Sequence, residues 1–426
     1  LDEREVKELE GKVMTHPLTI TSGGSCPASP FKADISLFYV NDSGVKSLYK
    51  EYEGKPLFIN TSLAKEIITN QNEKEKEEFF NLIQKGESEE DRENFDEAIQ
   101  YFSEAIEMYN GSAFSIFKRA RLYRVTKQLD KAIEDYNNYI SLEPDDFKGY
   151  INRGIVKSEK KDYNDAINDL QKGLEINPDD HIGHMHLGFI KQQIKDYKGS
   201  LESFTEAIRI DPENEFFYLQ RASVSVDLDD YITAEKNYSK AIELGDESAE
   251  TFYWRGVARE KIEDFDAAEK DFIKTIELDP NNGIAYYSLG LMRESQDKYD
   301  LAIAFFDKAI NLDKNNAIAY SARGNAKSNS EDYEGAIEDY SKAIEINPTL
   351  LIPYFNRGNL KSDIDDNEGA ISDYSKAIEI DPNHENSYFN RALCKDKLED
   401  NDGYLEDFKK VIELNPLNEE ALCLRG

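Results

Sequence analysis

The chain has 426 residues and a formal net charge of −34, and a single compact core seldom grows this large, so several units or a repeat array are expected. The strong acidity argues against nucleic acid as a partner, because a phosphate backbone would be repelled, and no run of about 18 apolar residues could span a bilayer. Three cysteines without CxxC spacing predict neither a disulfide framework nor a zinc site. They leave the compartment of this soluble chain unknown, with the reducing cytoplasm favoured.

The first 78 residues show no internal period. The stretch "TITSGGSCPASP" (19–30) is rich in small and turn-forming residues, which is typical of a flexible connector. Two apolar runs within 33–52 flank a turn-like Asn-Asp-Ser-Gly and indicate either a hairpin or one lone strand. We expect residues 1–60 to form an irregular arm lying on the rest of the chain, or a small contact module. We expect residues 61–78 to form a helix that leads into the next part.

From residue 79 onward the sequence repeats every 34 residues. The stretch "YEGAIEDYSKAIEINP" (333–348) returns as "NEGAISDYSKAIEIDP" (367–382). One small position recurs in fixed phase at Gly86, Ala120, Gly154, Gly188, Ala222, Gly256, Gly290, Gly324, Gly358, Ala392 and Gly426. A second small series begins at Ala98, an aromatic or Leu series begins at Phe102, and Pro closes most units. Ten units therefore fill 79–418 without insertion, and 419–426 match the start of an eleventh, truncated unit.

Each unit carries two stretches with apolar residues at helical spacing, and Pro ends the second stretch. Small residues sit where two helices must approach closely, and aromatics fill the space beside them. One such hairpin cannot bury both of its faces alone, but a stack of ten can. This pattern resembles the tetratricopeptide repeat over about four-fifths of the chain. The resemblance implies an all-α, right-handed solenoid of about ten helical hairpins with a short irregular N-terminal segment.

In this family the first helix of each unit lines the concave side, with positions 2, 5, 6, 9, 12 and 13 facing inward. Positions are numbered here from 1 to 34 within each unit, starting at residues 79, 113 and so on. Large apolar and aromatic residues dominate these positions, and an apolar surface of this extent usually binds a partner. The resemblance thus implies a groove formed by Phe114, Phe117, Ile151, Asn152, Ile182, Met185, His186, Phe189, Phe216, Leu219, Gln220, Tyr253, Trp254, Ile284, Tyr287, Asn356 and Asn390.

Positions 5 and 6 of the units leave alternatives open. The residues at position 5, such as Phe117 and Tyr253, either face a partner or pack between neighbouring hairpins. Position 6 resembles an incomplete form of an asparagine ladder that holds peptide backbones in this family. Only Asn152, Asn356 and Asn390 match that ladder.

Two further residue series favour structural roles. Arginines recur at position 7, from Arg119 to Arg391, and we expect their stems to cover apolar surface while their heads pair with nearby acids. The stretch "HIGHMH" (181–186) holds three of the five histidines, but helical phase directs His186 away from the other two, which disfavours a metal site.

The sequence favours a non-enzymatic scaffold that binds a protein or peptide partner in an apolar groove. We find no phosphate loop, metalloprotease motif or nucleophile elbow, and we expect no cofactor, metal or catalytic residue. One alternative is a substrate-recruiting or regulatory arm of an enzyme whose catalytic domain follows Gly426. Another is a permanent subunit or assembly factor of a larger complex.

Overall fold

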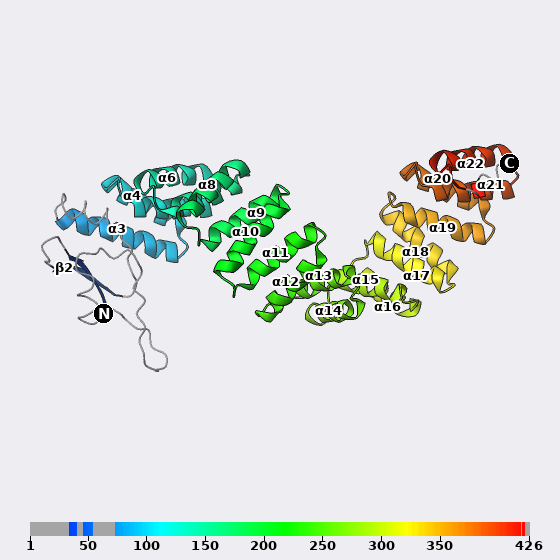
Figure 1. Cartoon of the computed structure of the whole chain (residues 1–426), viewed down its shortest axis with the longest axis horizontal. Coiled ribbons are helices and arrows are strands. Elements are labelled where there is room, and N and C mark those ends of the chain that lie inside the picture. Colours follow the sequence, from blue (N-terminus) through cyan, green and yellow to red (C-terminus); the bar gives the residue numbers. More distant parts are fainter. Residues whose placement is uncertain (1–33, 41–45, 54–72, 419, 422–426) are drawn as a thin grey trace. The chain divides into compact units, whose positions relative to one another are not determined.

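The structure is a computed structural model, and it describes residues 34–40, 46–53, 73–418 and 420–421. Twenty helices follow one another in pairs through this part of the chain (Figure 1). The chain divides into two compact units, Leu1–Asp211 and Pro212–Gly426, and each is described by itself.

In the first unit four helix pairs pack in succession. The helices are α3 (Glu73–Asp91), α4 (Phe95–Met108), α5 (Ala113–Val125), α6 (Leu129–Leu142), α7 (Phe147–Glu159), α8 (Tyr163–Ile176), α9 (His181–Gln193) and α10 (Tyr197–Ile210). The two members of each pair form a hairpin, and each second helix also packs against the first helix of the next pair.

The second unit continues the same arrangement with six pairs. Its helices are α11 (Glu215–Asp227), α12 (Tyr231–Glu243), α13 (Ala249–Lys261), α14 (Phe265–Leu278), α15 (Gly283–Glu294), α16 (Tyr299–Leu312), α17 (Ala317–Asn329), α18 (Tyr333–Ile346), α19 (Leu351–Asp363), α20 (Asn367–Ile380), α21 (Glu385–Lys397) and α22 (Asn401–Leu414). The expectation of an all-α stack of helical hairpins is confirmed. The odd-numbered helices α3 to α21 are called first helices below, and the even-numbered helices α4 to α22 second helices.

Two strands precede the helices. Strands β1 (Asp34–Val40) and β2 (Lys46–Glu53) pair antiparallel, with a register shift between Ser36 and Phe38. The hairpin is therefore the correct one of the two alternatives expected for 33–52. Most of the helix expected at 61–78 lies outside the described residues, and helix α3 runs from Glu73 past residue 79 without a break. Residues 73–78 of the expected helix therefore belong to α3, which is also the first helix of the first repeat.

The hairpins have recurrent local causes. Asn282 caps α15 by accepting a hydrogen bond from the backbone N–H of Ala285 (3.0 Å), and Asp332 caps α18 by accepting from Gly335 (3.0 Å). Position 15, in the turn within each hairpin, has a left-handed backbone with φ between 57° and 68° in all ten pairs, and it is never Gly. Helix α12, whose unit lacks the closing Pro, ends instead through Gly245 at φ +115°.

The core of most hairpins pairs small residues with rings. A Cβ added at Gly324 would lie 2.8 Å from Cε1 of Tyr340, so only a small residue allows the two helices to approach this closely. Ala336 is fully buried beside the same ring. The two small series and the aromatic series of the sequence therefore form the contact that closes most hairpins.

Candidate functional site

The apolar residues at position 2 are accessible on the first helices. Phe216 on α11 is 39% exposed and Ile284 on α15 is 61% exposed. Ile182, Ile318 and Ile352 are exposed at the same position of their units. Phe114 is half-buried, with Nζ of Lys118 5.7 Å from the centre of its ring. Ile182 in the first unit and the other exposed members in the second therefore lie outside the hairpin cores, whereas Phe114 packs against two core clusters.

The residues at position 5 pack against the cores to a greater extent. The ring centres of Phe117 and Tyr136 lie 5.8 Å apart, and those of Tyr253 and Phe272 lie 5.7 Å apart. Tyr287 contacts Phe306 in the same way, at 5.7 Å. Of the two alternatives for position 5, facing a partner or packing between hairpins, packing explains why one side of each ring is buried.

Ile151 requires a correction. It is 3% exposed and belongs to the core cluster around Leu170, because Gly173 and Gly183 leave room for its side chain. Its inclusion in a partner-binding groove is therefore wrong. Met185 and Leu219, at the same position, are half-buried, and Phe189 at position 9 packs edge-on against Phe204 at 5.3 Å.

The asparagines at position 6 already hold hydrogen bonds within the protein. Nδ2 of Asn356 donates to Oδ1 of Asn325 (2.9 Å), which also accepts from the hydroxyl of Tyr340 (2.8 Å). Asn390 makes the same contact with Asn359 (2.9 Å), and Asn152 donates to the carbonyl of Lys148 (2.8 Å). The amide groups of Asn356 and Asn390 connect neighbouring hairpins, and that of Asn152 bonds to a carbonyl one turn earlier in its own helix. The pairing of Asn325 and Asn359 with position 6 was not predicted from the sequence, because both lie at position 9, where apolar residues were sought.

The other position-6 residues differ from one another in exposure. Trp254 is 38% exposed, and its ring centre lies 5.3 Å from that of Tyr253. Gln220 is half-buried. Burial, with a smaller effect of Arg124, lowers the pKa of His186 to about 4, so this imidazole is neutral at pH 7.

The histidines of 181–186 do not converge. Nε2 of His184 lies 2.9 Å from the carbonyl oxygen of Pro178, and His186 packs near Phe189 with ring centres 6.4 Å apart. Within the described residues no group of three or more His, Cys, Asp or Glu side chains is arranged to hold a metal ion.

The arginines at position 7 are structural, as expected. Arg255 donates from Nε and Nη2 to the two carboxylate oxygens of Asp271 (2.9 and 2.7 Å), and from Nη1 to Ser239 of the preceding second helix (3.3 Å). The same fork occurs at Arg119, Arg153, Arg323, Arg357 and Arg391, each with the aspartate 16 residues later. The pairing joins each first helix to its own second helix and to the previous one.

Some units depart from this arginine pairing at one or both partners. Leu187 and Leu289 replace the arginine in two units, and Ser203 and Phe305 replace the aspartate in those same units. In a third unit Arg221 donates from Nε to Oδ1 of Asn237 (2.9 Å), and burial lowers its pKa. The arginines thus serve to neutralise buried aspartates, and a ligand-binding role is not needed to explain them.

Two carboxylates on the first helices stand apart from this pairing. Glu260 on α13 and Glu294 on α15, both at position 12, are half-buried, and desolvation raises the pKa of each. Neither makes a hydrogen bond or ion pair with another described residue. The sequence shows them only as two acids among many, because their burial depends on how neighbouring hairpins pack.

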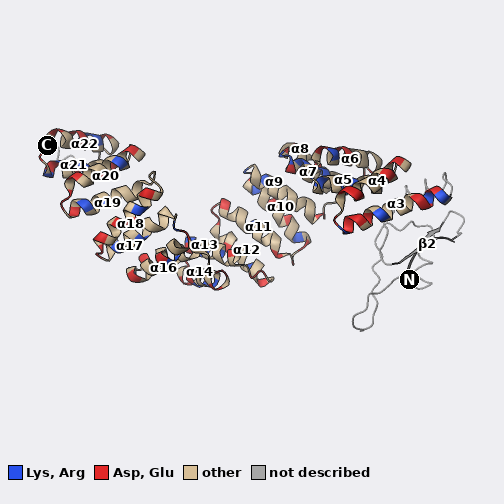
Figure 2. Ribbon diagram, turned by 180° about the vertical axis from the view of Figure 1, so that it is seen from behind, with Lys and Arg blue, Asp and Glu red and all other residues tan. Residues whose placement is uncertain are grey.

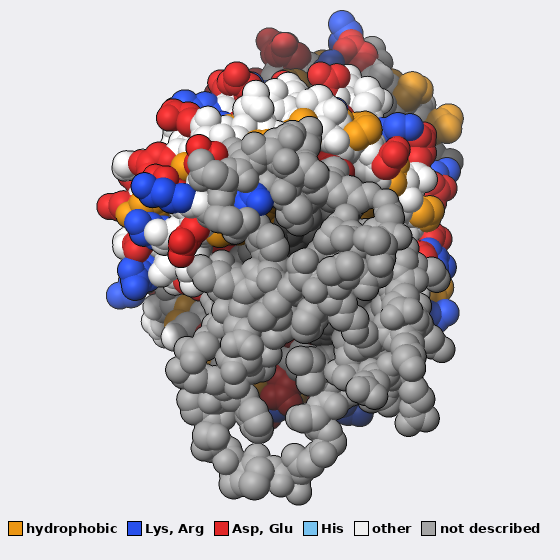
Figure 3. All heavy atoms as spheres, turned by 90° about the vertical axis from the view of Figure 1, so that its left-hand side faces the viewer, with side chains coloured by type: hydrophobic (Ala, Val, Ile, Leu, Met, Phe, Trp, Pro, Cys, Tyr) orange, Lys and Arg blue, Asp and Glu red, His pale blue; other side chains and the backbone are white. Residues whose placement is uncertain are grey.

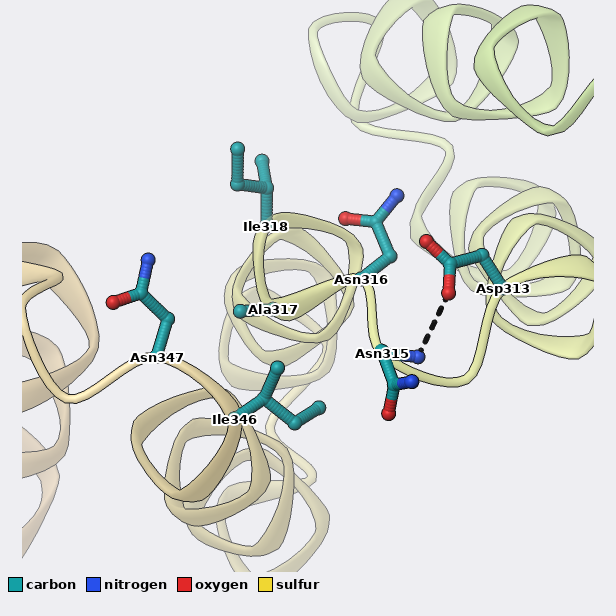
Figure 4. A pocket seen from close by; sticks show the side chains of 7 residues that line it. All are labelled: Asp313, Asn315, Asn316, Ala317, Ile318, Ile346 and Asn347. Atoms are coloured by element: carbon teal, nitrogen blue, oxygen red, sulfur yellow. Dashed lines mark hydrogen bonds between the residues drawn. The ribbon is translucent and has the colours of Figure 1, made fainter.

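Charge is spread over both units. Acidic residues occur along the helices of each unit (Figure 2), and the end-on view shows acidic and basic side chains interspersed over the described surface (Figure 3). A shallow pocket of about 510 Å³ in the second unit is lined by Asp313, Asn315, Asn316, Ala317, Ile318, Ile346 and Asn347. Ile318 of the position-2 series lies at its edge, and the backbone N–H of Asn315 donates to Asp313 (2.9 Å; Figure 4).

Comparison with known families agrees with this architecture. Tetratricopeptide repeat models match residues 83–147, 147–180, 183–214, 256–317, 317–350 and 353–384. Together these segments cover more than half of the chain, and the chain belongs to the tetratricopeptide repeat family. Members of this family are generally non-catalytic interaction scaffolds, and no catalytic family is indicated.

Solved structures with similar folds also consist of such repeats. MamA is 26% identical over 40% of this chain and 92% of its own, with a TM-score of 0.38. YrrB, described as a TPR protein with an unusual peptide-binding site, is 24% identical over 43% of this chain and 95% of its own (TM-score 0.39). Yeast Tom70 is 19% identical over 82% of this chain and 94% of its own (TM-score 0.38). No curated protein matches the sequence. Among the described residues, no helix combines the length and the apolar character that crossing a bilayer requires.

Proposed function

We propose that the chain is a non-enzymatic interaction scaffold that holds a segment of a partner polypeptide on its first helices. The observation that carries this proposal is the exposed apolar series at position 2, which includes Ile182, Phe216, Ile284, Ile318 and Ile352. Single exposed apolar residues are ordinary on a protein surface. Five that recur at the same position of equivalent helices indicate a surface selected for contact.

The exposed position-2 side chains are also separate from the interactions that hold the hairpins together. The cores use the buried small and aromatic series, and the arginine–aspartate forks join the helices. Replacing Ile284, which is 61% exposed, should therefore remove contact area from a bound segment while leaving the fold intact. Residues at position 5, such as Tyr253, are less suitable because their rings contribute to the core.

Binding of peptides selected on the full chain tests the proposal. Random peptides displayed on phage would be selected on the immobilised protein, and the affinity of synthetic copies would be measured for the variants Phe216→Ser and Ile284→Ser. Removing one buried aliphatic contact costs on the order of 1–2 kcal/mol, so each variant should bind roughly tenfold more weakly. Circular dichroism should show unchanged helicity.

The matched control is Ile232→Ser on the second helix α12, where the isoleucine is 58% exposed. This variant removes the same side chain from a similarly exposed site outside the first helices, and we expect its peptide affinity to equal that of the wild type. Peptides that bind all three variants as tightly as the wild type, or that lose the same affinity with Ile232→Ser, would overturn the proposal.

A further inference from the structure

The two unpaired carboxylates described above lie next to arginines that are already engaged elsewhere. Arg259 precedes Glu260 in the sequence, but its guanidinium donates to Asp271 (2.8 Å) and to Glu235 (2.9 Å). Arg293 precedes Glu294 and donates to Glu269. The arginines that precede the two glutamates are thus engaged elsewhere. Lys261 offsets the effect of burial on the pKa of Glu260 only in part, and no cation does so for Glu294.

Other half-buried glutamates on first helices have partners. Glu90 on α3 accepts from Nζ of Lys118 at 2.9 Å, and Glu159 on α7 accepts from Nε of Arg124 at 2.6 Å. Partial burial of a carboxylate is costly unless a cation or hydrogen-bond donor compensates for the lost water. Neither Glu260 nor Glu294 has a hydrogen bond or ion pair of this kind among the described residues. Lys261 offsets part of the cost for Glu260 through its charge, and Glu294 bears the cost uncompensated.

Each of the two glutamates ends a row of apolar and aromatic side chains. Tyr253, Val257 and Glu260 are spaced at i, i+4 and i+7 on α13, so they share one face of the helix. Tyr287, Leu291 and Glu294 repeat this spacing on α15. Tyr253 and Val257 of the first row pack against a core cluster to which α15 contributes Leu289 and Met292.

Trp254 extends this surface. Its side chain is 38% exposed, and its ring meets Tyr253 edge-on with centres 5.3 Å apart. Aromatic faces attract cations and also cover the apolar stems of lysine and arginine. The aromatic rings therefore suit the apolar stem of a lysine or arginine, and the carboxylate that follows them suits its charged end.

We propose that the surface formed by Tyr253, Trp254, Glu260, Tyr287, Leu291 and Glu294 binds a partner segment that carries a lysine or arginine among apolar residues. The cation pairs with Glu260 or Glu294, and the neighbouring apolar side chains lie on the aromatic rows. Charge complementarity supports this occupant, since the chain carries a net charge of −34 and burial raises the pKa of both acids although Lys261 acts against it at Glu260. This inference rests on the proposed function and adds the chemistry of the partner.

The same phage-selected peptides provide the probe, and Trp254 provides the signal because it is the only tryptophan in the chain. Synthetic copies of the selected peptides without tryptophan would be titrated into the full chain, and the change in Trp254 fluorescence would be followed. The test variant is Glu260→Gln with Glu294→Gln. A control variant, Glu338→Gln with Glu406→Gln, changes net charge equally at two exposed acids of the second helices.

We expect the selected peptides to share a basic residue flanked by apolar ones. Loss of a charge-assisted contact should weaken their binding to the test variant about tenfold or more, while the control variant should bind like the wild type. A peptide with its lysine changed to glutamate should bind poorly to the wild type and regain affinity for Glu294→Lys.

The possible failures separate the two proposals. Peptides that depend on Ile284 but lack a basic residue, or that bind the test variant as well as the wild type, would overturn this inference and leave the proposed function standing. Basic peptides that are weakened equally by both charge variants would show unspecific attraction and also overturn it. Peptides that bind Phe216→Ser and Ile284→Ser undiminished would overturn both proposals.

Discussion

Replacing Asp373 with serine should destabilise the hairpin of α19 and α20 far more than replacing Asp373 and Arg357 together. Asp373 is 3% exposed and accepts from Nε and Nη2 of Arg357 (2.9 and 2.7 Å) and from Nζ of Lys361 (2.8 Å). Without this carboxylate, two largely buried cations lose their counter-charge. The aspartate is thus the member of the group whose loss leaves the most uncompensated charge.

The magnitude follows from the pairing. Removing one partner of a buried ion pair costs about 3–5 kcal/mol, whereas removing both together often costs little. Arg357→Leu combined with Asp373→Ser reproduces the residues that the chain already has at Leu187 and Ser203. In that unit Nζ of Lys191 donates instead to the carbonyl of Gly199 (3.3 Å), a contact that Lys361 could also make in the double variant. We expect the double variant to lose about 1–2 kcal/mol, which gives a coupling energy of at least about 1 kcal/mol before the cost of Arg357→Leu alone is added.

Hydrogen exchange of the backbone amides is the appropriate assay. Repeats are stabilised mainly by their neighbours, so unfolding of the full chain need not follow two states, whereas exchange reports the opening free energy of α19 and α20 directly. Amides of the distant helix α12 provide an internal control. If the double variant opens as easily as the sum of the two single variants predicts, the pair does not act as a unit and the reasoning is refuted.

Two further predictions concern local stability. Lys195 has φ +64° in the turn before α10, a backbone conformation that glycine adopts more easily than lysine. Lys195→Gly should therefore raise the opening free energy of that hairpin, measured by hydrogen exchange, by roughly 0.5–1 kcal/mol. Lys198→Gly within α10 should lower the same free energy by a similar amount. If both variants lower it, the backbone at Lys195 carries no strain. The pKa of about 4 for folded His186 lies below the value near 6.5 of an unfolded histidine, so the unfolded state binds a proton first as pH falls. The stability that neutral His186 contributes, up to about 3 kcal/mol, is therefore present above about pH 6.5 and is lost by about pH 4. His186→Asn should flatten this pH dependence of the opening free energy, measured by hydrogen exchange on α9. An equally steep dependence in His186→Asn would contradict the lowered pKa of His186.

The repeat architecture could be predicted from sequence because it depends on local, periodic information. Small residues such as Gly324 and rings such as Tyr340 recur in fixed phase, and their contact closes most hairpins in the structure. The paired helices follow from the same spacing. The division of the chain between Asp211 and Pro212 could not be predicted, because the repeat continues across it without any change in period.

The sequence predicted that the position-7 arginines would pair with acids, but it did not predict which acids. The sequence indicated that the arginines of position 7 would meet nearby acids, and the structure shows that the acid is the aspartate 16 residues later, as for Arg323 and Asp339 (2.8 and 2.5 Å). A separation of 16 residues spans two helices and a turn. It becomes a contact only once the hairpin has closed, so no helix-surface rule identifies it.

The candidate site was the least predictable part. Family positions placed Ile151 and Ile284 on the same surface, but Ile151 is buried and Ile284 is 61% exposed. Neighbouring glycines allow Ile151 to enter the core, and this depends on the packing between consecutive hairpins. The isolation of Glu260 and Glu294 has the same origin, because it depends on where Arg259 and Arg293 find their partners.

The central claim is that a partner polypeptide lies on the first helices. Hydroxyl-radical footprinting of the full chain, with and without a bound peptide, measures this directly as the change in oxidation rate of individual side chains. We expect Phe216, Trp254 and Ile284 to be protected, while Ile232 and Ile273 on the second helices are oxidised at unchanged rates. Protection confined to Ile232 and Ile273, with Trp254 oxidised as before, would contradict the account.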